Sequence, residues 1–212
     1  MRSAPSCAAS RRPTSPARIF SSTAALIPAR SSPHLGFLGS RISNHLKRGA
    51  YGVFLVTNFW ETGTDERKQA TAAVRAAKNA AVKHFIWSTL PDVEAISGGK
   101  FDVPHFTGKA KIDRIVKEAG FVHHTFVVAP FFYQNLAGAV APQKRPDGTF
   151  GWALAIDPTV RAIHMGDITE LGNIVAGAFA HPEEAGDGEY LPLVGDGMSF
   201  NEIVDTLYLF GL

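Results

Sequence analysis

The N-terminal part of this chain lacks acidic residues, and no aspartate or glutamate occurs before Glu61. Eight of the 21 lysine and arginine residues lie in that stretch, and all 19 acidic residues lie at or after Glu61. The net charge of +2 therefore averages a basic leader and a mildly acidic remainder. Because the average does not describe the globular part, it is no indication of a nucleic-acid-binding face, and we expect no direct nucleic acid partner.

Cysteine and long apolar runs are also scarce. Cys7 is the single cysteine, which excludes an intrachain disulfide and a cysteine-based zinc site. A reducing location, cytoplasmic or nuclear, is therefore expected. The closest approach to a long apolar run, residues 121–142, is broken by histidines, Pro130, Gln134 and Asn135. Since a membrane-spanning helix needs about 20 apolar residues, we expect neither a span nor a membrane partner.

A glycine-rich phosphate-binding turn is missing as well. The glycine pair Gly36-Phe37-Leu38-Gly39 lacks a third glycine, and no strand pattern precedes it. The first strand pattern starts at Tyr51, too soon after this pair for a strand–helix–strand unit to fit between. The pair is therefore not interpreted as a phosphate loop.

Residues 1–44 are rich in serine, arginine, proline and alanine and have little hydrophobic periodicity. We expect this segment to be disordered. It has two interpretations. An arginine- and serine-rich, acid-free leader is typical of a mitochondrial transit peptide, which would imply a mitochondrial location. Translated intron or shifted-frame sequence has the same composition, and the five prolines favour this second interpretation. The globular domain is expected over residues 45–212.

Strand and helix patterns alternate through the first half of that domain. Apolar runs with β-branched and aromatic residues predict buried parallel strands, and apolar residues at helical spacing predict the helices between them. The expected elements are strands over 51–57, 82–89 and 121–128, a helix capped by Thr64 or Asp65, and a helix from Pro104 to a stop at Gly120. Such alternation predicts an α/β fold with a Rossmann-like, doubly wound parallel sheet.

The second half predicts a small C-terminal α/β subdomain. Its expected elements are a short helix over 133–141, a turn at 146–148, a strand over 150–156, a helix over 169–180 capped by Thr169, a strand over 190–194, and a final helix opened by a capping box. The box is Ser199-Phe200-Asn201-Glu202, in which the serine and the glutamate each satisfy the other's backbone amide. The apolar end at residue 212 suggests that the C-terminus is cut short.

Four segments together resemble the NmrA-like family, atypical members of the short-chain dehydrogenase/reductase superfamily. They are GAYGVFLVTNFWE at 49–61, HFTGK at 105–109, PFFYQNL at 130–136, and GDI with LG at 166–172. The resemblance implies a protein that binds NADP or NAD and acts as a redox-sensing or nitrogen-regulatory partner of other proteins. The family's opening strand, glycine-rich turn and 2′-phosphate-reading residue have no counterpart here. The domain is therefore expected to be an incomplete, N-terminally truncated version of the fold, with impaired cofactor affinity.

The end of the first strand carries Thr57, Asn58 and Phe59, at the edge where open α/β sheets bind ligands. By resemblance this segment contacts the cofactor's ribose or nicotinamide. The alternative is an asparagine that only satisfies loop amides. Lys68, in the next helix, resembles a family position that approaches the cofactor, although a solvated charge fits the neighbouring basic residues better.

His105 and Lys109 lie one helical turn apart and share a face. In active short-chain dehydrogenases a tyrosine fills the first position as proton donor, the lysine holds the nicotinamide ribose, and a serine on the neighbouring strand orients the substrate. Ser88 is placed for that last role. With histidine in place of tyrosine, the resemblance implies ribose binding by Lys109 and a lost catalytic role, although a histidine can also shuttle protons.

Tyr133, Gln134 and Asn135 resemble the family segment that closes over the nicotinamide, or else Tyr133 packs under the subdomain. His123 and His124 are adjacent in a predicted strand, so their side chains point to opposite faces and do not chelate one metal ion. No metal site is expected.

Three functions remain open. The first is an NAD(P)-binding regulatory or redox-sensing protein with weak or no catalysis and a regulatory protein partner. The second is an NAD(P)H-dependent oxidoreductase, and the third is a nonfunctional fragment. If the sheet lacks its first strands, the strand at 51–57 becomes an edge, and self-association is expected.

Overall fold

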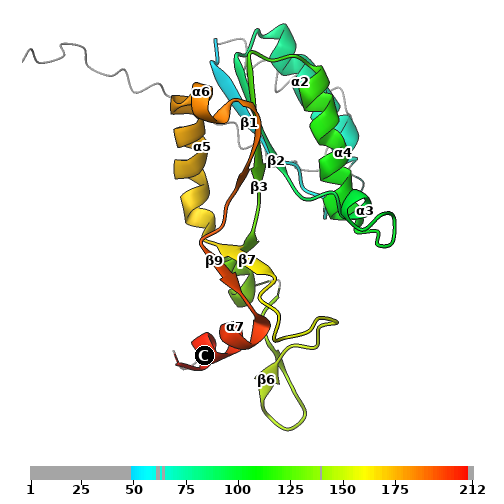
Figure 1. Ribbon diagram of the computed structural model, residues 1–212, viewed down its shortest axis with the longest axis vertical. Coiled ribbons are helices and arrows are strands. Elements are labelled where there is room, and N and C mark those ends of the chain that lie inside the picture. Colours follow the sequence, from blue (N-terminus) through cyan, green and yellow to red (C-terminus); the bar gives the residue numbers. More distant parts are fainter. Residues whose placement is uncertain (1–48, 61–62, 64, 139, 210–212) are drawn as a thin grey trace, which may run out of the picture.

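A computed structural model describes residues 49–60, 63, 65–138 and 140–209. Its main sheet has four parallel strands in the order β1-β2-β3-β8 (Figure 1). These strands are β1 (Gly52–Leu55), β2 (His84–Thr89), β3 (His123–Val128) and β8 (Asp187–Pro192). The predicted parallel α/β sheet is therefore confirmed. The expected disordered leader, residues 1–44, lies outside the described residues.

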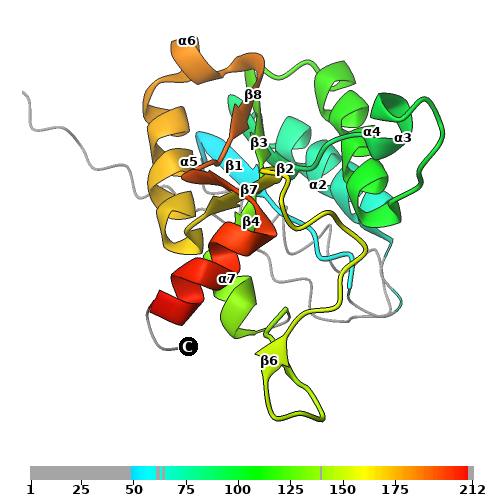
Figure 2. The ribbon, with the colours of Figure 1, turned by 60° about the horizontal axis from the view of Figure 1, so that its bottom comes forward.

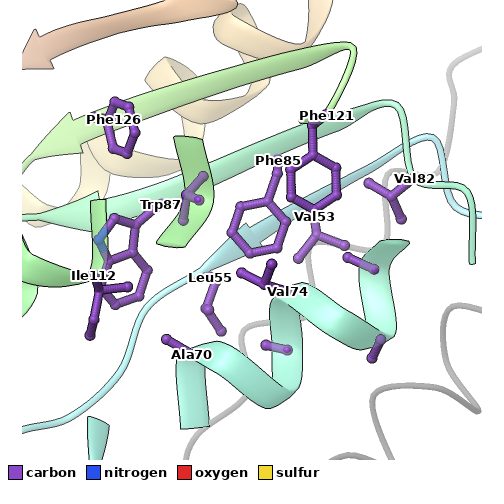
Figure 3. Close-up of a cluster of buried hydrophobic side chains, with 14 residues drawn as sticks. Val53, Leu55, Ala70, Val74, Val82, Phe85, Trp87, Ile112, Phe121 and Phe126 are labelled. Atoms are coloured by element: carbon purple, nitrogen blue, oxygen red, sulfur yellow. The ribbon is translucent and has the colours of Figure 1, made fainter. Parts of the chain in front are cut away.

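Helices cover both faces of this sheet, as a doubly wound fold requires (Figures 1 and 2). Helices α2 (Glu66–Asn79) and α4 (Pro104–Glu118) cover one face, where Val53, Phe85 and Trp87 enter one core cluster (Figure 3). Helix α5 (Leu171–Ala180) covers the other face, where Phe54 and Ile86 enter a second cluster. Successive strand residues alternate between these clusters because strand side chains point alternately to the two faces.

Local sequence signals set the ends of the two large helices. Asp65 caps α2, and its Oδ1 accepts a hydrogen bond from the Lys68 amide at 3.0 Å. Pro104 occupies the first turn of α4, where its missing N–H has no helical partner to lose. Beyond α4, Gly120 adopts a positive φ of 63°, which favours glycine and ends the helix as predicted.

The second subdomain surrounds a small sheet in the order β4-β7-β9 (Figure 2). Its strands are β4 (Phe131–Phe132), β7 (Ile163–Gly166) and β9 (Asp196–Met198), with a separate hairpin of β5 (Gln143–Lys144) and β6 (Phe150–Gly151). The remaining short elements are α3 (Val93–Ile96), η1 (Tyr133–Ala137), η2 (Ile168–Glu170), α6 (Pro182–Ala185) and α7 (Phe200–Leu209). Met165, Phe200 and Ile203 form the buried centre of this part.

Two expectations for the second half are wrong. Of the strand predicted over 150–156 only β6 forms, because Leu154 and Ile156 are about half exposed and residues 152–156 pair with no described strand. Thr169 is not the helix cap. Asp167 accepts the Thr169 amide at 2.8 Å and opens η2, which leads directly into α5.

The capping box is confirmed. The Glu202 carboxylate accepts the Ser199 amide at 2.8 Å, and the Ser199 hydroxyl accepts the Glu202 amide at 3.2 Å. The predicted helix over 133–141 is the shorter 3-10 helix η1. Within the described part of the chain, no helix is both long and apolar enough to cross a membrane.

Candidate functional site

The candidate site lies at the carboxyl edge of the main sheet. Because β1, β2 and β3 are parallel, their last residues meet at one edge, beside the first turns of α4. Ligands of open α/β sheets bind at this edge. Thr57 follows β1 there, and Thr89 ends β2.

Lys109 is the centre of a buried polar group at this edge. Its Nζ donates to the Thr57 carbonyl at 2.8 Å, to Thr57 Oγ1 at 3.0 Å and to Glu66 Oε1 at 2.7 Å. The Thr57 hydroxyl in turn donates to Glu66 Oε1 at 2.5 Å. Lys109 and Glu66 are only 8% and 9% exposed, so this ion pair is shielded from water. The lysine therefore ties β1, α2 and α4 together.

His105 lies one turn before Lys109, in a group of aromatic rings. Its ring centroid is 5.6 Å from Phe59, 5.1 Å from Trp60 and 4.7 Å from Phe106. The Trp60 side chain is 74% exposed. The structure thus brings Thr57, Phe59, His105 and Lys109 to one place, and it presents flat apolar rings to solvent beside them.

Ser88 does not join this group. Trp87, the preceding residue, packs in the α2/α4 core cluster, so strand alternation places Ser88 on the α5 face. His105 and Lys109 belong to α4, on the other face of the sheet.

Asn58 and Lys68 lie at the rim. Asn58 is exposed, and its Oδ1 accepts the Trp60 amide at 3.1 Å, which shapes the turn after β1. Lys68 is exposed and forms an ion pair with Asp65 at 3.1 Å within the first turn of α2.

The start of η1 is formed by Tyr133, Gln134 and Asn135. Side chains of this segment bond to Asp196 at the start of β9 and to Asp167 directly after β7. The Tyr133 hydroxyl donates to Asp196, and this bond is the largest cause that raises the pKa of Tyr133 to about 12. Gln134 Nε2 donates to Asp167 Oδ1 at 2.6 Å, and its Oε1 accepts the Ile168 amide at 3.2 Å. The Asn135 carbonyl accepts the Gly138 and Val140 amides.

A second polar group lies under α4, centred on Asp113, and it was not predicted from the sequence. This carboxylate is 5% exposed and accepts hydrogen bonds from the Thr89 hydroxyl at 2.7 Å and the Tyr190 hydroxyl at 2.9 Å. Burial raises the pKa of Asp113, and burial together with the Asp113 hydrogen bond raises the pKa of Tyr190. The available signal was a charged residue four positions after Lys109, on the same buried helix face.

The side chains of His123 and His124 in β3 point to opposite faces of the sheet, as neighbouring strand residues do. The His123 ring lies 5.7 Å from His84, whereas the His124 ring lies 5.7 Å from Phe126, which belongs to the α4-side core. Among the residues that the structure describes, no three His, Cys, Asp or Glu side chains are grouped to hold a metal ion.

Comparisons with known proteins identify the family of this chain. The sequence model of the NmrA-like family matches residues 40–208. An NmrA-like family domain-containing protein of Dictyostelium discoideum is 30% identical over 167 residues, which cover 76% of this chain and 54% of that protein. An NmrA-like family domain-containing oxidoreductase of Aspergillus japonicus is 26% identical over 177 residues, covering 74% of this chain and 52% of that protein.

Two crystal structures of NmrA, a negative transcriptional regulator, show the same fold. One is in complex with NAD and the other with NADP. Each has a TM-score of 0.67 and 24% identity; they cover 79% and 81% of this chain and 52% of the matched chains. The chain thus spans about half the length of these relatives. With its family match and its Rossmann-type sheet, this chain belongs to the NmrA-like family.

Proposed function

We propose that the chain is an NAD(P)-binding protein that serves a redox-sensing or transcription-regulatory role, with weak or no catalysis of its own. The observation that supports this most directly is a buried Lys109 that follows His105 by one helical turn, at the position where active relatives carry a tyrosine. The lysine supplies a fixed positive charge at the ligand-binding edge. The position of the tyrosine proton donor is filled by an imidazole packed among aromatic rings.

The described residues fit the nicotinamide half of a dinucleotide better than its phosphates. Thr57, Asn58 and Phe59 offer a hydroxyl, an amide and a ring at the end of β1. Within the described part of the chain, no strand leads into a glycine-rich turn of the kind that cradles a pyrophosphate. When bound, the nicotinamide would supply hydride chemistry, and these residues would hold its ribose.

Lys109 already uses its three N–H donors on Thr57 and Glu66. A ribose hydroxyl would therefore have to take the place of one of these acceptors, and Thr57 Oγ1 at 3.0 Å is the longest of the three contacts. The lysine would then hold the ribose and stay paired with Glu66.

Calorimetry with NADP, NAD and nicotinamide mononucleotide tests this fit. Because the residues proposed to bind belong to the nicotinamide side, the mononucleotide should bind within about tenfold of the dinucleotides, which corresponds to 1.4 kcal/mol. Phe59→Ala, which removes the ring at the end of β1, should weaken all three ligands, whereas Phe150→Ala, at an exposed position of the β5–β6 hairpin, serves as the matched control. Micromolar binding of NADP with no detectable binding of the mononucleotide would overturn the assignment.

Redox sensing requires different affinities for the oxidised and reduced cofactor, because a ligand shifts an equilibrium only by its differential affinity. We expect NADP and NADPH to differ in Kd in the same calorimeter. Equal affinities would exclude the sensing role and leave a binding protein without a redox readout.

The alternative function is an NAD(P)H-dependent oxidoreductase, favoured by the oxidoreductase relative of Aspergillus japonicus. It predicts NADPH consumption with aldehydes, ketones or quinones that is lost in His105→Ala. We expect no such consumption in the wild type. The third possibility, a nonfunctional fragment, predicts a chain that binds none of the nucleotides and unfolds without a cooperative transition.

A further inference from the structure

A separate cavity opens at the same edge of the sheet, beside the ends of β2 and β3 and next to β8. Its volume is about 220 Å³. Apolar walls come from the loop after β2, from α4 and from the end of β3, and the polar lining is Asp92, Asp113 and Tyr190. No lysine, arginine or histidine of the described chain lines it. The cavity thus combines apolar walls with two carboxyl groups and a hydroxyl.

The two buried carboxylates under α4 differ in one respect. Glu66 has a counter-ion, the Lys109 ammonium at 2.7 Å. Asp113 is buried more deeply, yet its hydrogen bonds come from the neutral hydroxyls of Thr89 and Tyr190. Among the described residues no basic side chain approaches Asp113 within 4.0 Å. Buried aspartates are normally paired with a cation in direct contact, whereas the Lys117 charge reaches Asp113 only through the Tyr190 hydroxyl.

The nearest charges do not fill this role. Lys117 Nζ lies 3.2 Å from the Tyr190 hydroxyl and 4.9 Å from the centre of its ring, so it is held at the tyrosine. Lys111, two residues before Asp113 and therefore on another side of α4, is exposed and paired with Glu94 at 2.6 Å. The Asp92 side chain caps α3 through the Ala95 amide at 3.0 Å.

We propose that this cavity binds a small organic cation, a primary ammonium or amidinium carried on an apolar body. The cation would lie against the Asp113 carboxylate, at the end of the cavity that also holds the Tyr190 hydroxyl. The apolar body would fill the space between Leu90, Ala110 and Val128. This site is independent of the proposed nucleotide site, because it uses neither Lys109 nor the residues after β1.

Benzylammonium, benzyl alcohol and benzoate test the proposal, because they share one ring and differ in charge. In titrations of the full chain followed by amide NMR shifts, benzylammonium should shift Leu90, Ala110 and Val128. It should bind at least about tenfold more tightly than the alcohol, a difference of about 1.4 kcal/mol, and benzoate should not bind. Equal binding of the alcohol, or shifts that lie elsewhere, would refute the charge assignment.

Asp113→Asn keeps the shape of the side chain and removes its charge, and it should weaken benzylammonium at least tenfold. Asp205→Asn, an exposed carboxylate on α7, is the matched control and should leave binding unchanged. If Asp113→Asn does not fold, the wild type still decides the matter. Its affinity for benzylammonium should fall as the pH is lowered through the raised pKa of Asp113, and an affinity independent of pH overturns the proposal.

Discussion

At the scale of single residues, the Lys109–Glu66 pair is the most consequential contact in the candidate site. It joins two helices and the end of β1, and it does so almost out of contact with water. Removing one member of a buried ion pair leaves the charge of the other buried and unpaired, which costs about 3–5 kcal/mol. Lys109→Met should therefore lower the free energy of unfolding by that amount in urea titrations.

Lys111→Met provides the comparison on the same helix. Lys111 forms an equally short pair with Glu94, but both side chains are at least half exposed. Exposed pairs contribute less than about 1 kcal/mol, so this variant should be nearly neutral. Similar losses in the two variants would show that the Lys109 pair is solvated in solution.

His84 gives a second residue-scale prediction, in the dependence of stability on pH. Its ring is fully buried, and burial, followed by the charges of His123 and His124, lowers its pKa from 6.5 to about 4. Between these values the unfolded chain binds a proton that the folded chain does not. Stability should therefore fall as the pH drops from 6.5 to 4, by about 3 kcal/mol, and level off below.

His84→Gln isolates this contribution when its pH profile is subtracted from that of the wild type. The subtraction cancels the contribution of Asp113, whose raised pKa makes stability rise as the pH falls. A difference profile that is flat between pH 4 and 6.5 would contradict the prediction.

At the scale of elements, the sequence predicted the parts of the fold where one signal is strong and local. β1 follows from an uninterrupted apolar run, and α4 from a proline at its start and a glycine after its end. Strands β7 and β9 were not predicted, because their sequences, IHMG and DGM, mix polar residues and glycine with the apolar ones and form no apolar run. The run at 150–156 looks like a strand, but Trp152 packs against Phe200 while Leu154 and Ile156 stay about half exposed.

The candidate site was predictable to a similar extent. Position at a strand end identified Thr57, and one helical turn linked His105 to Lys109. The partners of these residues were not predictable, because they come from distant segments. Glu66 is 43 positions from Lys109, and Tyr190 is 77 positions from Asp113. Only the packed sheet brings them together, and no spacing in the sequence encodes those contacts.

Gly52, the first residue of β1, packs directly against Phe179 of α5. A Cβ at Gly52 would lie 2.3 Å from Phe179 Cε1 and 3.1 Å from the His84 carbonyl. Gly52→Ala should therefore destabilise the fold by about 1–3 kcal/mol through overpacking. Chemical denaturation measures the loss.

Gly108→Ala is the opposite case and serves as the control. Gly108 lies inside α4, and an added Cβ would meet nothing within 4 Å. Alanine there should raise stability by about 0.5–1 kcal/mol, because glycine is a poor helix former. A neutral Gly52→Ala would show that Phe179 moves aside without cost.

At the scale of the whole molecule, the order of the main sheet places β1 and β8 at its two ends. Among the described strands, β1 pairs with β2 alone, and it carries no charged residue. Such an edge is a site for pairing with another copy. We therefore predict that the weight-average mass in sedimentation velocity rises with protein concentration.

Tyr51→Lys should reduce this self-association, because it adds a charge next to β1 at a side chain that is 44% exposed. Tyr208→Lys, at the exposed end of α7, adds the same charge far from that edge and should have no effect. A wild-type chain that stays monomeric at every concentration would refute the prediction, as would equal effects of the two lysines.

The connections between the strands of the main sheet also predict the order in which the strands dock during folding. β1, β2 and β3 are joined by short helical crossovers, α2 in the first and α3 with α4 in the second, whereas residues 129–186, including most of the second subdomain, separate β3 from β8. Long loops close late because their ends must first find one another. We therefore expect β8 to dock after the other three strands of the main sheet, and Tyr190 with it. In that order the cavity beside Asp113 is complete only when β8 is in place, so a ligand held there would favour chains whose main sheet is complete.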